Sequence, residues 1–81
     1  MHCTVLLFAQ LAEALNTRQL TIELPDESNV GDALEVLANQ HEAIESIRDS
    51  IAVAVDESYA GMQTTLTADC TIALIPPVSG G

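Results

Sequence analysis

Apolar residues along the chain follow two different periods, and these periods predict where strands and helices lie. Residues 3–8 (Cys-Thr-Val-Leu-Leu-Phe) are β-branched and apolar with little alternation, which predicts a strand buried on both faces at the centre of a sheet. Residues 19–24 alternate between polar and apolar side chains, as a half-buried strand with one solvated face does. The short connection between them predicts that the two strands pair antiparallel.

A helical period replaces this pattern in the middle of the chain. Residues 29–41 predict the main helix, because apolar residues recur on one stripe at Val30, Ala33, Leu34, Leu37 and Ala38. Asn29 can cap this helix, with Asp32 three residues later as its capping-box partner. Shorter helical segments are expected over residues 10–15 and 42–50.

The last third of the chain returns to strands. Residues 51–55 predict a third strand, residues 59–66 a short edge strand or loop, and residues 71–75 a nearly all-apolar strand that is again central. The order predicts an α+β fold: a β-grasp roll with a mixed sheet on one main helix and the first and last strands adjacent and parallel. A ferredoxin-like fold needs a second full helix over residues 59–70, a segment too short and too rich in threonine for one.

A tail with unusual composition follows the last strand, which divides the chain into a domain (residues 1–75) and an extended tail (residues 76–81). Pro76 and Pro77 stiffen the approach, whereas Gly80 and Gly81 carry no side chain that would obstruct a narrow active site. We expect the chain to end in the carboxylate of Gly81. Joined to AMP, this carboxylate becomes an electrophile that sulfur can attack, leaving a thiocarboxylate. The alternative is an inert, frayed end.

The net charge of the chain limits the kinds of molecule that it can bind. The 81 residues hold twelve acids and two bases, Arg18 and Arg48, with no lysine and a formal net charge of −10. General attraction to nucleic acid or to an anionic membrane is therefore excluded, and phosphates would have to be held by a partner. Solubility is the simpler reason for an acidic surface.

The apolar run at residues 5–9 is too short for a signal peptide, so we expect a cytoplasmic protein. In that compartment Cys3 and Cys70, which begin the two central strands, are expected to be neighbouring reduced thiols.

The end of the chain resembles a known family. Residues 73–81, Ala-Leu-Ile-Pro-Pro-Val-Ser-Gly-Gly, resemble the terminal signature of the small subunit of molybdopterin synthase, the MoaD-like sulfur carriers of the ubiquitin-like β-grasp group. Residues 6–9 and 11–13 are similar to that family's opening strand and turn. One departure is the turn before the last strand, which is often Asp-Gly-Asp-like and here is Ala-Asp-Cys (residues 68–70); Asp69 can adopt the positive φ that glycine would supply.

The resemblance implies a role for each part of the tail. An E1-like adenylating enzyme would use ATP to activate Gly81, with Gly80 beside it, and a sulfur donor protein would convert the terminus to a thiocarboxylate. Val78 and Ser79 would lie along the large synthase subunit, where the sulfur passes to cyclic pyranopterin monophosphate in molybdenum cofactor biosynthesis. The family's synthase is a heterotetramer. The carrier itself would bind no cofactor and would not be an enzyme alone.

Partner contacts are expected around the exit of the tail. We predict an apolar collar of Phe8, Tyr59 and Ile75, continued by Pro76 and Pro77, although core packing is the simpler interpretation of a lone phenylalanine. Two cysteines and two histidines without CxxC or HxxxH spacing predict no metal site. The alternatives are a sulfur carrier for thiazole or cysteine synthesis, a ubiquitin-like protein modifier, and an acidic binding module with an inert tail.

Overall fold

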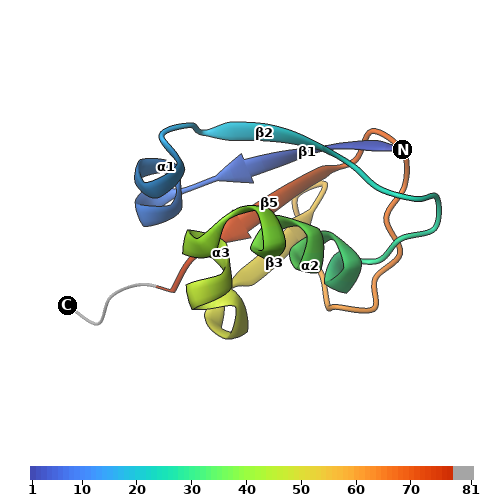
Figure 1. Ribbon diagram of the computed structural model, residues 1–81. Helices are drawn as coiled ribbons and strands as arrows, with labels where there is room; N and C mark the ends of the chain where they lie inside the picture. The colour runs from blue at the N-terminus through green and yellow to red at the C-terminus, as the bar shows by residue number, and fades with distance from the viewer. Residues whose placement is uncertain (78–81) are drawn as a thin grey trace.

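The computed structural model describes residues 1–77, and its centre is a five-stranded mixed sheet in the order β2-β1-β5-β3-β4 (Figure 1). The strands are β1 (His2–Leu7), β2 (Gln19–Glu23), β3 (Ala52–Val55), β4 (Ser58–Tyr59) and β5 (Thr71–Ile75). The helices are α1 (Ala9–Leu15), α2 (Val30–Gln40) and α3 (Glu42–Ile47), followed by a 3-10 turn, η1 (Arg48–Ser50). This is the predicted β-grasp architecture.

The two apolar strands lie side by side inside the sheet. β1 and β5 pair in parallel, with Thr4 opposite Thr71 and Leu7 opposite Leu74. β2 pairs antiparallel with β1, and β3 pairs antiparallel with β5. Because β1 and β5 run in the same direction, their carboxyl ends reach the same end of the molecule, where the chain continues beyond β5 (Figure 1).

Helix α2 covers one face of this sheet and supplies much of the core. Its five predicted stripe residues are all buried. Asn29 caps it reciprocally: the Asp32 amide donates to Asn29 Oδ1 at 2.8 Å, and the Asn29 amide donates to Asp32 Oδ2 at 3.0 Å. Ile44 of α3 extends the same cluster, so the core lies between the helices and one face of the sheet.

The prediction that the first and last strands are buried on both faces is wrong. In β1, Cys3, Val5 and Leu7 are buried, whereas Thr4 and Leu6 are half-buried. In β5 the burial alternates in the same way. Within residues 1–77 no helix packs on the second face of the sheet, so apolar side chains such as Leu6 and Ile75 stay partly exposed there. This second face is called the open face below.

Among residues 1–77, six residues other than glycine have a positive φ, and two of them lie at the end of α1 and before β5. Asn16 ends α1 in the left-handed region, with φ 56°. Asp69 has φ 63° before β5 and takes the conformation expected of it in place of a glycine.

Replacing Asn29 tests how much its capping hydrogen bond contributes to the stability of α2. Asn29→Ala leaves the first-turn amides without their side-chain acceptor, so we expect the free energy of unfolding to fall by about 1 kcal/mol. Urea unfolding followed by circular dichroism measures the change. Asn39→Ala makes the same substitution on the exposed side of the same helix and should have little effect; equal losses in both variants would argue against the cap.

Candidate functional site

The site begins where β5 ends. Ile75 is half-buried, Pro76 is buried and Pro77 is exposed, so the chain leaves the packed domain between the two prolines. The predicted contacts of Val78, Ser79, Gly80 and Gly81 lie outside the described residues. Consequently the described part of the site is the surface from which the tail departs.

The open face presents small and apolar side chains around that departure point. Strand register puts Leu6 beside Ala73 and Ala52 beside Ile75, and residues paired across strands project to the same side of a sheet. A hollow of about 460 Å³ lies on this face, lined by Leu6, Phe8, Asp56, Glu57, Thr71 and Ala73. The face is thus apolar near its centre, with acidic groups at the turn between β3 and β4.

The three predicted collar residues are placed differently. Phe8 directly follows β1 and is 45% exposed, so it is not a core residue. Ile75 ends the neighbouring strand β5, at the same end of the sheet. Tyr59, 79% exposed, pairs with Ala54 on the edge strand β4, so β3 and β5 separate it from β1. The structure therefore brings Phe8 and Ile75 to one end and leaves Tyr59 at the sheet edge.

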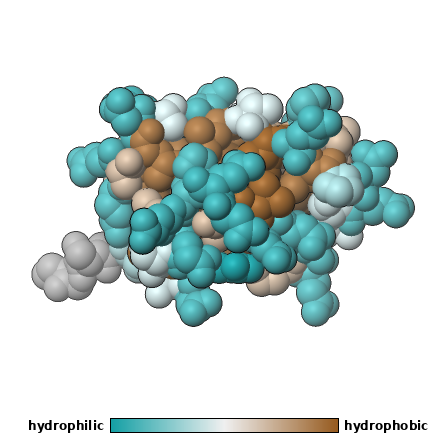
Figure 2. Space-filling view, in the orientation of Figure 1, coloured by the Kyte–Doolittle hydropathy of each residue, from teal (hydrophilic) through white to brown (hydrophobic). Residues whose placement is uncertain are grey.

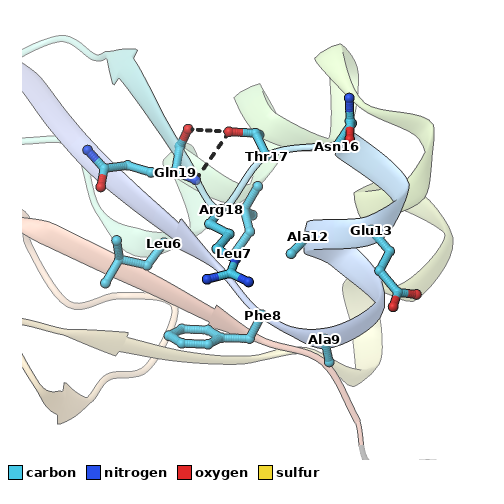
Figure 3. A pocket seen from close by; sticks show the side chains of 10 residues that line it. All are labelled: Leu6, Leu7, Phe8, Ala9, Ala12, Glu13, Asn16, Thr17, Arg18 and Gln19. Carbon is cyan, nitrogen blue, oxygen red and sulfur yellow. Dashed lines mark hydrogen bonds between the residues drawn. The ribbon is translucent and has the colours of Figure 1, made fainter.

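A second hollow, of about 800 Å³, joins this end of the sheet to α1 (Figure 3). Phe8, Ala12 and Arg18 line it, together with residues from the end of β1, from α1, and from the loop that leads into β2. In Figure 3 the side chain of Arg18 extends from its loop toward the ring of Phe8. The sequence interpretation missed Arg18, Leu6 and Ala73 as site residues, because no local pattern marks them.

Charge is distributed unevenly over the described residues. Among the open-face residues from β1, β5 and β3, His2 at the start of β1 is the one acidic or basic residue; the others are Thr4, Leu6, Thr71, Ala73, Ile75, Ala52 and Ala54. The acids lie instead on helices, turns and the edge strand β2. From the side shown in Figure 2, hydrophilic residues cover most of the surface around a hydrophobic band. The part of this face around Leu6, Ala73 and Ile75 carries no charged side chain, which on so acidic a chain suits contact with another protein.

Cys3 and Cys70 meet inside the core, as the sequence predicted. Both thiols are free and buried, and Cys70 Sγ donates to Cys3 Sγ at 3.4 Å. Burial, together with the neighbouring Cys3 thiol, raises the pKa of Cys70 to about 11. Cys70 therefore stays protonated at neutral pH and is not a candidate nucleophile.

The described residues show no other chemical centre. No group of three or more metal-ligating side chains occurs among residues 1–77. In the same range, no helix is long and apolar enough to cross a membrane.

Because the pKa of Cys70 differs between the folded and the unfolded protein, the free energy of unfolding should depend on pH. The folded state keeps the Cys70 proton up to about pH 11, whereas the unfolded thiol loses it near its ordinary pKa of 9.0. The free energy of unfolding should therefore fall as pH rises between these values. Urea unfolding of the wild type and Cys70→Ala across this range measures the effect. If both proteins lose stability equally with pH, Cys70 is not the group responsible.

Comparison with known proteins places the chain among small β-grasp proteins. The model of the ThiS family matches residues 5–81. Small archaeal modifier protein 1 of Haloferax volcanii is 36% identical over 83 residues, covering 93% of this chain and 95% of that protein. Its crystal structure aligns over the whole of both chains with a TM-score of 0.88 at 34% identity.

A further relative and a further solved structure are both named as subunits. The molybdopterin synthase sulfur carrier subunit of Arabidopsis thaliana is 31% identical over 77 residues, covering 95% of this chain and 80% of that protein. A solved complex of subunits 1 and 2 of the molybdopterin-converting factor from Helicobacter pylori includes a chain with the same fold, with a TM-score of 0.70 at 21% identity and full coverage of both chains.

Proposed function

The chain belongs to the ThiS family of sulfur carriers, and from this premise we propose that it is the sulfur carrier subunit of a molybdopterin synthase. In this role Gly81 is adenylated, converted to a thiocarboxylate, and donates its sulfur to cyclic pyranopterin monophosphate. The observation that carries the proposal is the path of β5, which leads from the sheet centre into Pro76 and Pro77 beside the uncharged side chains of Leu6 and Ala73 on the open face.

Each part of the tail has a separate task in this mechanism. Pro76 packs against the domain and Pro77 restricts the next peptide, which lowers the entropy lost when the tail docks. The four residues beyond Pro77 span roughly 13 Å when extended, which is enough to enter a partner's active site. Gly80 and Gly81 have no Cβ to collide with the walls of such a site.

The chemistry requires partners, because the carrier supplies only the carboxylate. An E1-like adenylating enzyme lets the Gly81 carboxylate attack the α-phosphate of ATP, releasing pyrophosphate. Sulfur at the oxidation level of sulfide, supplied by the sulfur donor, then attacks the carbonyl carbon of the adenylate; a C–S bond forms, the C–O bond to AMP breaks, and the thiocarboxylate and AMP are left. The large synthase subunit receives the loaded tail and holds the phosphorylated pterin, in a heterotetramer with two carriers. The carrier's net charge of −10 suits this division, since it would repel the phosphates itself.

One alternative is supported by a specific observation. The relative from Haloferax volcanii is named a modifier protein, which favours a ubiquitin-like modifier joined to lysines of other proteins. Both functions begin with activation of Gly81, but they differ in the group that attacks the adenylate. Because this chain contains no lysine, it offers no side-chain amine to a second activated copy.

Intact-mass measurement of the protein from its own cells separates these functions. A sulfur carrier should show the mass increase of one sulfur replacing one oxygen, localised to Gly81 by fragmentation. A modifier should instead form lysine adducts. A variant lacking Gly80 and Gly81 should show neither. The carrier function would be wrong if the wild type, mixed with its activating enzyme, sulfur donor and ATP, gained no sulfur.

Truncating Phe8 tests the docking surface. Because Phe8 is 45% exposed, Phe8→Ala should cost little stability but weaken binding to the large synthase subunit about tenfold or more. Titration calorimetry measures the binding and thermal unfolding the stability. Met62→Ala is the matched control, since Met62 is 46% exposed but lies in the loop beside the start of α2. A loss of stability without a loss of binding would make Phe8 a packing residue.

A further inference from the structure

The two arginines of this chain, Arg18 and Arg48, differ in whether an acidic side chain pairs with them. Arg48, in η1 after α3, lies 3.5 Å from Glu45, so its charge is already matched within the domain. Arg18 forms no ion pair with any of residues 1–77. In a chain with twelve acids, an arginine without an ion pair among the described residues is unexpected, because acids are available over most of the surface.

The backbone at Arg18 is held firmly at the end of the sheet. The Leu7 amide donates to the Arg18 carbonyl at 2.9 Å, which ties the loop to the last residue of β1. On either side, the left-handed Asn16 ends α1, and the Thr17 hydroxyl donates to the Gln19 carbonyl at 3.0 Å. Arg18 is therefore presented from a fixed position next to Phe8.

Arg18 borders a hollow whose lining is apolar on the side of β1 and polar along the loop before β2. Leu6, Phe8 and Ala12 help to line the hollow of about 800 Å³ that Arg18 borders. Glu13 also borders it, but its carboxylate points away from Arg18 in Figure 3. A charge-assisted hydrogen bond to a guanidinium is strongest where a partner excludes water, and an apolar rim helps to exclude it.

We propose that Arg18 is a specificity-determining contact that pairs with an aspartate or glutamate of the protein surface that covers Phe8. The proposal rests on the proposed function and commits to the large synthase subunit as that protein. The contact surface of the large subunit would carry an apolar patch that packs on Phe8. It would also carry one carboxylate placed so that both of its oxygens accept hydrogen bonds from the guanidinium of Arg18. A polyanion does not fit, because one guanidinium cannot offset repulsion from a net charge of −10.

The two arginines provide a matched pair of variants. Arg18→Gln and Arg48→Gln each remove one positive charge, so both proteins have a formal net charge of −11. The large synthase subunit of the same organism is titrated with each variant and with the wild type at low and at high NaCl. We expect Arg18→Gln to weaken binding about tenfold at low salt and Arg48→Gln to change it less than about twofold.

A second pair of variants and a salt series separate pairing from packing. Arg18→Glu, which reverses the charge, should bind more weakly than Arg18→Gln, and the difference should shrink at high salt. Thermal unfolding should be alike in all variants, because Arg18 is exposed.

The inference is overturned if Arg18→Gln and Arg48→Gln bind alike, or if the Arg18 variants lose only stability. It is also overturned if they bind the large subunit normally and lose only adenylation. In each case the wild type would still acquire sulfur at Gly81 and bind the large subunit, so the proposed function would stand. Failure of the wild type itself to acquire sulfur would refute the proposed function instead.

Discussion

The parallel pairing of β1 and β5 is the contact on which the rest of the structure depends. It joins the two ends of the chain at the centre of the sheet, with Val5 opposite Ile72 and Leu7 opposite Leu74, all buried under the helices. Because the strands are parallel, Phe8 and the start of the tail reach the same end. An antiparallel pairing would have put them at opposite ends, so strand direction places the start of the tail at the same end of the sheet as Phe8, for which we propose a docking role.

The helical side of the molecule and the open face of the sheet differ in packing and in charge. The helical side packs the core and carries many of the acids, which keep a small, highly charged chain soluble. On the open face, the ends of β1 and β5 near the tail carry no acidic or basic side chain, so a partner can cover Leu6, Ala73 and Ile75 without having to dehydrate a charged group. In the function we propose, the partners hold the phosphates, and the acidic surface of this chain does not compete for them.

Much of the fold was predictable because its signals are local. The stripe of α2 and its Asn29 cap act between residues three or four positions apart, and the left-handed turn at Asp69 depends on a single residue. The thiol contact between Cys3 and Cys70 followed from placing the first and last strands side by side. The burial of the open face was predicted wrongly, since an apolar run such as residues 3–8 looks the same whether one face or two are covered.

The sequence by itself determined the helices, the strands, the acidic character and the resemblance carried by residues 73–81, because these depend on neighbouring residues and on composition. Only the tertiary structure decided that Phe8 is exposed, that Tyr59 lies at the sheet edge, and that Arg18 stands beside Phe8 while Arg48 pairs with Glu45. The reason is register: most of these positions are set by hydrogen bonds between strands far apart in the chain, and no pattern within one segment records which partner a strand will have.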